Sequence, residues 1–417
     1  MQDETDILIV GGGIIGLSCA YYLNAAGRSV RLVERETIGS GASHGNCGMV
    51  CPSHAPPLTQ PGVVARGLKG MMHRGAPLHI RPTLNPRTLS WLMRFAARCS
   101  LDRMRPAMAA RAAILNSSRT AFDELIAAES LAEKIEWTTN GALFVCRQPA
   151  TMALTGDYFS RAAEVGVAAI ELSGAELTAK EPALRDDLAG GFFVGSDAHL
   201  RPDRLVSELQ RVVTERGVVI EENTPVQGLI ADGSMATGVD TDSGPRHAKT
   251  VVVAAGAWSS TLKRSLRASV PIEPGKGYSI TTTRPKICPT HPIAFQERGC
   301  IATPFNSGYR LGGTMEFAGF DDRLRKVRIE SIRRAATEYM REPEGETVEE
   351  EWYGWRPMTY DGVPIIDRLP SYDNAYLAAG HNMLGISMAT GTGKLVSELV
   401  TDAEPHIDPQ PYSFDRL

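Results

Sequence analysis

The sequence predicts an α/β fold in which a domain with a parallel sheet is interleaved with a second domain whose sheet is mainly antiparallel. A short apolar, β-branched run at residues 7–10 leads into a glycine-rich turn and a helix, as in parallel sheets. A second buried strand is expected at 250–255, after a long excursion, and a last one at 376–379. In contrast, residues 265–345 alternate apolar and polar side chains, which indicates an antiparallel sheet with one open face.

Size and composition are those of an ordinary globular protein. The chain has 417 residues, of which 43% are hydrophobic and 22% charged, and its formal net charge is -4. Proteins that bind nucleic acid usually carry a strongly basic stripe, so no nucleic-acid partner is expected. No apolar run approaches the roughly 20 residues that a membrane-spanning helix needs. We therefore expect no transmembrane segment, which leaves peripheral docking on a membrane surface open.

The cysteines indicate reduced thiols. The chain has 7 of them, an odd number, and no CxxC pair occurs, so neither a disulfide framework nor a metal site such as a zinc centre is predicted. The acidic N-terminus lacks the basic and apolar segments of a secretory signal. The expected location is the cytoplasm, with a position peripheral to the inner membrane as the alternative.

The most specific motif is the N-terminal turn, in which Gly11, Gly13 and Gly16 have GxGxxG spacing. The first glycine permits a tight turn, the second allows close approach to a pyrophosphate, and the third lets the helix pack closely on the strand. The free N–H groups and the helix dipole then face the phosphates. Glu34 ends the next strand, 23 positions after Gly11, where an acid accepts hydrogen bonds from a ribose hydroxyl. The motif predicts a bound dinucleotide but does not separate FAD from NAD.

Further elements follow from hydrophobic periodicity and from glycine and proline positions. Helices are expected at 17–26, 87–129, 157–165, 174–180, 205–216 and 385–401. Strands are expected at 29–33, 142–146, 218–221 and 226–231, and a glycine-rich loop at 39–50. The dinucleotide-binding domain is predicted to comprise 1–55, 190–262 and 350–417, and the substrate domain 56–189 and 263–349.

Three further segments accompany the N-terminal turn: the loop ASHGNCGMV, the strand VVVAAGAWS and the C-terminal stretch WYGWRPMTYDGVPIIDRLPSYDNAYLAAGHNMLGISMATGTGKLVSELV. Together they resemble the D-amino-acid oxidase family of FAD-dependent oxidoreductases, nearest to its bacterial D-amino-acid dehydrogenase branch of the small-subunit type. The resemblance covers nearly the whole chain. It implies FAD as the cofactor, in a Rossmann-like FAD-binding domain beside an α+β substrate domain. The segment Gly-Asn-Cys-Gly at 45–48 departs from the usual Ala-Asn-Ala-Gly.

The resemblance also implies catalytic residues. Arg356, in WRPMT, would bind the substrate carboxylate through a planar fork of donors that cannot lose its charge; a structural salt bridge is the alternative. Tyr278 would line the substrate pocket, with a core tyrosine equally expected. His381 would lie near the flavin or the electron acceptor, with a structural histidine as the alternative. Covalent attachment of FAD at His44 or Cys300 is a less favoured possibility.

The predicted FAD-binding residues come from the N-terminal turn, the loop after the second strand, two middle strands and the loop before the last helix. They are Gly11, Gly13, Ile14, Ile15, Gly16, Glu34, Arg35, Ala42, Ser43, Asn46, Gly48, Met49, Val226, Ala255, Gly256, Trp258, Met383, Leu384, Gly385 and Ile386. The N-terminus of the last helix would stabilise the negative charge of the reduced flavin. An ordinary helix entry is the alternative there.

The predicted function is FAD-dependent oxidative deamination of a small amino acid, of the D-amino acid, D-proline or hydroxyproline type. A hydride would pass from Cα to flavin N5, and the resulting imino acid would hydrolyse in water. The alternatives are a glycine- or sarcosine-type amine oxidase, a flavin-binding subunit without amine chemistry, and a nicotinamide-dependent dehydrogenase. The expected partners are the amino-acid substrate and an electron acceptor, which is a quinone, an electron carrier or O₂.

Overall fold

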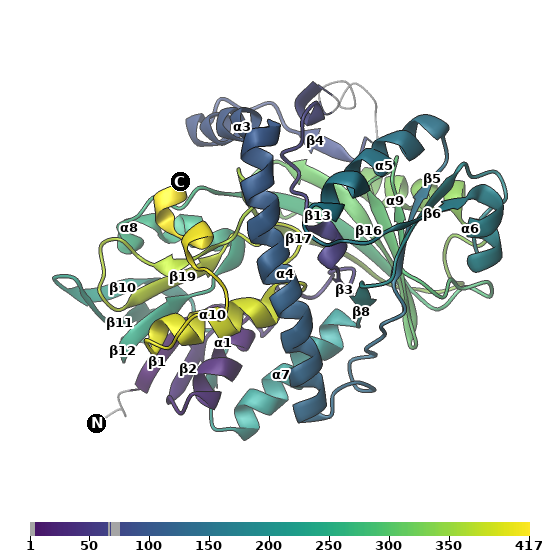
Figure 1. Cartoon of the computed structure of the whole chain (residues 1–417). Coiled ribbons are helices and arrows are strands. Elements are labelled where there is room, and N and C mark those ends of the chain that lie inside the picture. The colour runs from purple at the N-terminus through teal and green to yellow at the C-terminus, as the bar shows by residue number, and fades with distance from the viewer. Residues whose placement is uncertain (1–4, 66, 68–75) are drawn as a thin grey trace.

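The computed structural model describes residues 5–65, 67 and 76–417 and contains two large sheets that lie side by side (Figure 1). The first sheet has eight strands: β1 (Thr5–Val10), β2 (Val30–Val33), β9 (Val219–Glu221), β10 (Val226–Asp232), β11 (Met235–Thr241), β12 (Arg246–Val253), β18 (Ile365–Arg368) and β19 (Ala375–Ala379). The second has nine: β4 (Leu78–Ile80), β5 (Ala142–Cys146), β6 (Ile170–Ser173), β7 (Gly190–Val194), β13 (Ile272–Thr282), β14 (Ile293–Phe295), β15 (Cys300–Phe305), β16 (Gly308–Phe317) and β17 (Val348–Thr359).

The first sheet has the parallel core that the sequence predicts. Strand β1 is parallel to both β2 and β12, and β12 is also parallel to β19. The apolar side chains of β1 and β12 are buried because helices pack on this sheet. Figure 1 shows α1 (Ile14–Ala25), α7 (Pro202–Glu215) and α10 (Ala389–Val400) grouped beside it. The predicted α/β fold class is therefore confirmed.

The second sheet is mainly antiparallel, as predicted, but the expectation of one open face is wrong. All residues of β13 and of β16 are buried. The helix α9 (Lys326–Tyr339), which the sequence did not predict, packs against these strands. The charged residues of β13 and β16 are buried and paired: for example, Lys276 donates to two carbonyls, and Glu316 forms an ion pair with Arg325. The alternation of polar residues therefore does not mark a solvent-exposed face, because the charged groups have partners inside the protein.

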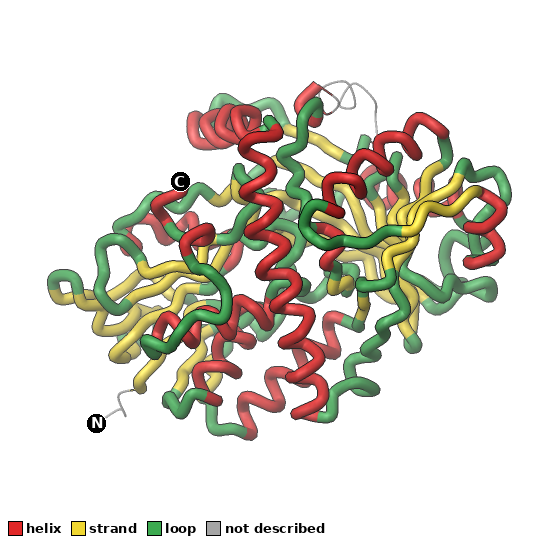
Figure 2. The backbone as a smooth tube through the Cα atoms, viewed as in Figure 1, coloured by secondary structure: helices red, strands yellow, loops and turns green. Residues whose placement is uncertain are grey.

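The remaining helices lie around the two sheets. The expected helical stretch 87–129 is two helices, α3 (Pro86–Arg98) and α4 (Leu101–Glu129), and α4 crosses the molecule between the two sheets (Figure 2). The other helices are α5 (Pro149–Ala163), α6 (Gly174–Lys180) and α8 (Lys263–Leu266), and β3 (Met49–Val50) pairs with β8 (Ala198–His199). Among the described residues, no helix has the length and apolar character that a membrane crossing requires. The predicted domain boundaries stay predictions.

Candidate functional site

A cavity of about 1080 Å³ is lined by residues from both sheets. It begins at the carboxyl ends of β1 and β2, where Val10, Gly11 and Val33 contribute to its wall. It continues past the loop 39–50 to the face of the second sheet that carries Arg356 on β17. Ligands of open α/β sheets bind outside the carboxyl ends of the strands, so this is the expected position for a dinucleotide.

The turn after β1 has the form that a dinucleotide pyrophosphate requires. Gly11 has a φ of +108°, and a Cβ there would lie 2.6 Å from the carbonyl oxygen of Ala254. A Cβ on Gly16 would lie 1.9 Å from the carbonyl oxygen of Gly11, so helix α1 can pack here only without a side chain. Within the described part of the chain, the N–H groups of Gly13 and Ile15 have no acceptor. These bare donors at a helix N-terminus fit the phosphates of FAD.

Glu34 lies beside this turn. One carboxylate oxygen accepts from the N–H of Gly12 at 2.7 Å and the other from the N–H of Glu36 at 3.0 Å. Each oxygen keeps a second lone pair, so the carboxylate can still accept hydrogen bonds from ribose hydroxyls. The neighbouring Arg35 places its guanidinium carbon 3.8 Å from the ring centroid of Trp258. Both of these predicted residues line the nucleotide end of the cavity.

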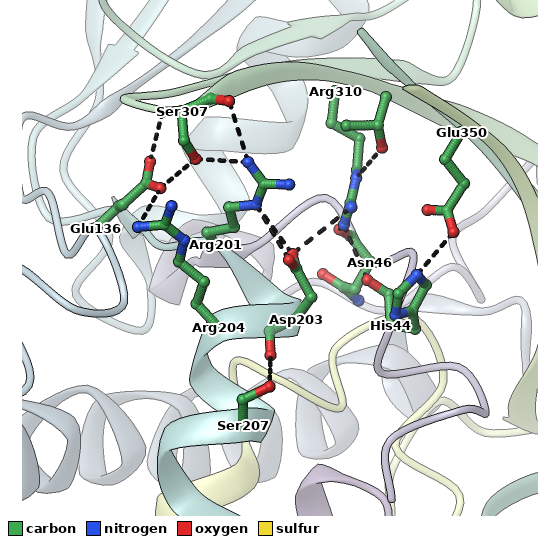
Figure 3. A network of polar contacts seen from close by, with 11 residues as sticks. His44, Asn46, Glu136, Arg201, Asp203, Arg204, Ser207, Ser307, Arg310 and Glu350 are labelled. Atoms are coloured by element: carbon green, nitrogen blue, oxygen red, sulfur yellow. Dashed lines mark hydrogen bonds and ion pairs between the residues drawn. The ribbon is translucent and has the colours of Figure 1, made fainter. Parts of the chain in front are cut away.

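The loop 39–50 is fixed by a buried arginine of the second sheet. Arg310 is 1% exposed, and its Nη1 donates to the carbonyls of His44 at 2.9 Å and Asn46 at 2.8 Å. Its Nε donates to Thr281, and an oxygen of Asp203 lies 3.7 Å away (Figure 3). The loop is thereby joined to β16 and to the start of α7. This contact has no signal in the sequence, because it links positions more than 260 residues apart.

The loop before α10 offers fewer donors than predicted. The helix begins at Ala389, four residues after the expected start. The N–H of Leu384 is already bonded to the carbonyl of His381 at 2.9 Å, so this donor is used within the turn. The N–H groups of Met383, Gly385 and Ile386 have no acceptor among the described residues, and all three residues line the cavity. Three of the four predicted donors are therefore available for a ligand.

Arg356 is a partly buried cation that faces the cavity. Its Nη1 donates to the carbonyl of Thr314 at 2.8 Å, and among the described residues no carboxylate lies within ion-pair distance. Burial lowers the pKa of Arg356 from its ordinary value, but a guanidinium keeps its charge under physiological conditions. A buried charge without an opposite partner is costly, so an anion is the ligand that this position favours. The alternative of a structural salt bridge therefore finds no partner in the part of the chain that the structure describes.

Two features of the backbone position Arg356. Thr314 has a φ of +56°, next to a register shift between β13 and β16, and its carbonyl is the one that accepts from Arg356. The Thr314 hydroxyl is buried and has no hydrogen-bond partner in the described ranges of the chain. A Cβ on Gly277 would lie 2.2 Å from the guanidinium carbon, so only glycine leaves room for the side chain. Strain of this kind at a bulge is typical of functional sites.

The structure does not bring the hydroxyl of Tyr278 to Arg356. Arg356 pairs with Gly275, three residues before Tyr278, so the two side chains lie on opposite faces of the sheet. The hydroxyl of Tyr278 donates to Glu316 at 2.7 Å, although the residue contributes to the cavity wall. His381 is also in the wall, and its Nε2 lies 3.0 Å from the hydroxyl of Thr392. Burial lowers the pKa of His381 to about 3. These contacts favour the structural alternative for both residues.

The other predicted cofactor residues line the cavity with two exceptions. Gly16 and Gly48 do not line it, and each instead permits close backbone packing, in the case of Gly48 against the carbonyl of Leu200. Those that line it are Gly11, Gly13, Ile14, Ile15, Glu34, Arg35, Ala42, Ser43, Asn46, Met49, Val226, Ala255, Gly256, Trp258, Met383, Leu384, Gly385 and Ile386. Their assignment to FAD stays a prediction, supported by their position.

All seven cysteines are free thiols, as expected. Cys47 and Cys300 line the cavity. Burial raises the pKa of Cys300 to about 12, so this sulfur is a neutral thiol rather than a thiolate nucleophile. His44 lies outside the cavity wall, and its Nε2 is 2.8 Å from a carboxylate oxygen of Glu350. Neither residue shows a contact that favours covalent attachment.

Sequence reasoning missed one wall of the cavity. The side chains of Trp91, Phe95, Met315, Phe317 and Met358 line it beside Arg356. They come from a helix and two strands that are far apart in the sequence. Apolar residues scattered along a sequence usually belong to the hydrophobic core, so nothing in the sequence marked these five residues as part of a site.

Comparisons with known proteins agree with this geometry. Residues 6–399 match the family described as DAO, FAD dependent oxidoreductase. A D-amino acid dehydrogenase of Vibrio cholerae serotype O1 is 31% identical over 405 residues, covering 96% of each chain. A D-amino acid dehydrogenase of Methylobacterium nodulans is 33% identical over 415 residues, again covering 96% of each. The crystal structure of glycine oxidase from Geobacillus kaustophilus is similar in fold, with a TM-score of 0.79, 24% identity and 99% of each chain covered.

Proposed function

Because the chain belongs to the DAO family of FAD dependent oxidoreductases, we propose that it oxidatively deaminates an α-amino acid, with D-amino acids as the class to test first. One observation carries the proposal: Arg356 presents to the cavity a partly buried positive charge that no carboxylate of the described residues compensates. The curated relatives named D-amino acid dehydrogenase support the choice of substrate. An α-carboxylate supplies the negative charge that Arg356 lacks among the described residues.

Each part of the site has a role in this reaction. FAD, when bound, supplies the acceptor for the hydride that leaves the substrate carbon. The bare N–H groups of Gly13 and Ile15 would hold its pyrophosphate, and those of Met383, Gly385 and Ile386 would stabilise negative charge at the ring. Arg356 would grip the carboxylate and so fix the orientation of the substrate. The imino acid that forms hydrolyses in water without a protein group.

Fewer observations support a choice of the electron acceptor and of the location. We propose a quinone or an electron carrier as the acceptor, with O₂ as the alternative, since the relatives are named dehydrogenases. We also propose the cytoplasm, or a position peripheral to the inner membrane, as the location, on the basis of the sequence alone.

Anaerobic titration tests the function. The purified holoprotein is mixed with single D- or L-amino acids, glycine, sarcosine, or hydroxyproline isomers, and flavin absorbance near 450 nm is followed. We expect at least one amino acid to bleach the flavin and yield the matching keto acid and ammonia. If dithionite reduces the flavin but no amine in the panel does, the protein is a flavin-binding subunit without amine chemistry. If only glycine or sarcosine does, the amine-oxidase alternative holds.

A further inference from the structure

We infer that the substrate carries a large apolar side chain, and that six residues beside Arg356 form the chamber that receives it. These residues, the apolar chamber, are Trp91, Phe95, Met315, Phe317, Met358 and Met383, and all of them line the cavity. The inference rests on the proposed function, because it takes Arg356 as the group that holds the carboxylate. It goes further in that it names the class of amino acid.

Two methionines stand directly beside the guanidinium. The sulfur of Met315 lies 3.7 Å from Nη1 of Arg356. Met358 follows Arg356 by two positions on β17, so both side chains project from the same face of the sheet. A Cβ on Gly275, the residue paired with Arg356, would lie 2.6 Å from Met358 and 2.7 Å from Met315. The two thioether side chains therefore meet next to the position proposed for the carboxylate.

Aromatic rings form the wall behind these methionines. Trp91 is 5% exposed and stacks on Phe95, with ring centroids 5.5 Å apart and 16° between the planes. Its ring centroid is 5.2 Å from that of Phe317. The indole N–H donates to the carbonyl of Met358 at 3.1 Å, so its only polar group is already used. The wall presents carbon to the chamber, while the flexible methionines let it adapt to different apolar shapes.

The charges of the cavity exclude a second ionised group on the substrate. Among the described residues, the aspartate, glutamate, lysine and arginine side chains that line the cavity are Glu34, Arg35, Glu297 and Arg356. The first two lie at the nucleotide end. Glu297 accepts from the hydroxyl of Tyr339 and from the backbone N–H groups of Arg147 and Gln148. Among the described residues, a charged substrate side chain beside Arg356 would therefore find no partner, and burying it there would be unfavourable.

Substrates of matched size and different polarity test the inference. The apparent second-order rate constant for anaerobic flavin reduction is measured for methionine against glutamine and glutamate, and for leucine against asparagine and aspartate. Both enantiomers of each are used. We expect methionine to exceed glutamate by about 100-fold or more, because the ionised side chain would lose its water without gaining a partner. Glycine should be slower than leucine, since each buried methylene contributes about fourfold.

The outcomes separate the inference from the proposed function. Reduction by glutamate, aspartate or glycine at least as fast as by leucine and methionine would overturn the apolar chamber and leave amino-acid oxidation intact. Reduction by no amino acid at all would remove the function itself, and with it the inference.

Two substitutions of Met315 test whether the apolar chamber is the source of the selectivity. Met315→Gln keeps the length of the side chain and adds polar atoms, so the ratio of the rate constants for methionine and glutamine should fall by about tenfold. Met315→Leu should keep that ratio within about threefold. Met93→Gln is the matched control, because Met93 is on α3 but 67% exposed. Since a ratio within one variant is insensitive to the amount of folded protein, an unchanged ratio in Met315→Gln contradicts the assignment. If Met315→Gln yields no holoprotein, Met358→Gln and Met358→Leu repeat the test.

Discussion

The turn between β1 and α1 and the surroundings of Arg356 are two ends of one cavity that are built in different ways. In the turn, the donors are backbone N–H groups. Gly11 and Gly16 occupy the positions at which a side chain would collide with the backbone. Around Arg356, a single side chain carries the charge, and its position depends on the carbonyl of Thr314, which is 42 positions away. The first region is local in the sequence, whereas the second is assembled by the pairing of distant strands.

This difference shows that the two regions tolerate change differently. A Cβ on Gly11 or Gly16 meets backbone atoms, which cannot move without distorting β1 and α1. A Cβ beside Arg356 meets the end of a flexible side chain, which can shift while the sheet stays intact. Damage to the turn should therefore abolish cofactor binding, and damage near Arg356 should impair turnover in a protein that still holds FAD.

The largest effect is expected from Gly16→Ala. The new Cβ would lie 1.9 Å from the carbonyl oxygen of Gly11. We expect a protein without flavin, with its free energy of unfolding lowered by about 1–3 kcal/mol. The ratio of absorbance at 450 and 280 nm and the melting temperature measure both effects. Gly195→Ala is the control, because a Cβ there would make only an ordinary contact at 3.6 Å. A yellow Gly16→Ala protein with full activity would show that the turn does not hold the cofactor.

Arg356→Lys comes next. Lysine keeps the charge but loses the planar fork, so kcat/KM for the best amino acid should fall by about 100-fold or more while FAD stays bound. Steady-state kinetics and the flavin spectrum provide the measurement. Arg341→Lys, at an exposed pair with Asp186, should leave both unchanged. A kcat/KM within about twofold of the wild-type value would show that Arg356 does not bind the substrate.

Gly277→Ala makes the comparison between the two regions most direct, because it is again a glycine-to-alanine change. Its Cβ would lie 2.2 Å from the guanidinium carbon of Arg356. We expect the guanidinium to be displaced, KM to rise by about tenfold, and the FAD content to stay that of the wild type. If Gly277→Ala instead loses FAD, as Gly16→Ala should, then a Cβ that meets a flexible side chain is no better tolerated than one that meets the backbone, and the proposed difference is wrong.

Arg310→Met tests the link between the two regions. The change leaves the carbonyls of His44 and Asn46 without their donor. One unsatisfied buried acceptor costs about 1–3 kcal/mol, so the dissociation constant of FAD should rise by about tenfold. Titration of the apoprotein with FAD gives this constant. Arg204→Met serves as the comparison, because the Arg204 side chain is half-exposed, although its partner Glu136 is buried. Unchanged affinity would mean that the loop 39–50 holds its shape without Arg310.

The smallest effect is expected from Thr314→Gly. Glycine adopts the φ of +56° without the strain that a β-branched residue carries, which is about 1 kcal/mol. The carbonyl that accepts from Arg356 is kept, so kcat/KM should change less than threefold and the melting temperature should rise slightly. Thr303→Gly, in the regular strand β15, should lower the melting temperature instead. A fall in the melting temperature of both variants would show that the packing of the Thr314 side chain stabilises the protein by more than its backbone strain destabilises it.

Local patterns account for what was predictable. Strand β5 was predicted at its observed bounds and helix α6 likewise, because periodicity and capping residues lie within each segment. The helix α9 and the closed second face of the nine-stranded sheet were missed. In the sheet, the alternating polar residues suggested solvent, and the sequence did not show that Lys276 and Glu316 have partners in the segment before α9. The same cause explains Tyr278, whose position near Arg356 was inferred without knowing the strand register.

By itself, the sequence determined the parallel fold, the cofactor turn and the family, because glycines at fixed spacing and apolar strands act on their immediate neighbours. Only the tertiary structure decided which face Arg356 occupies, that no described carboxylate neutralises it, and which apolar residues stand beside it. The physical reason is that charge compensation and cavity shape depend on strand register over long separations. A shift of one residue in that register would turn Arg356 to the other face.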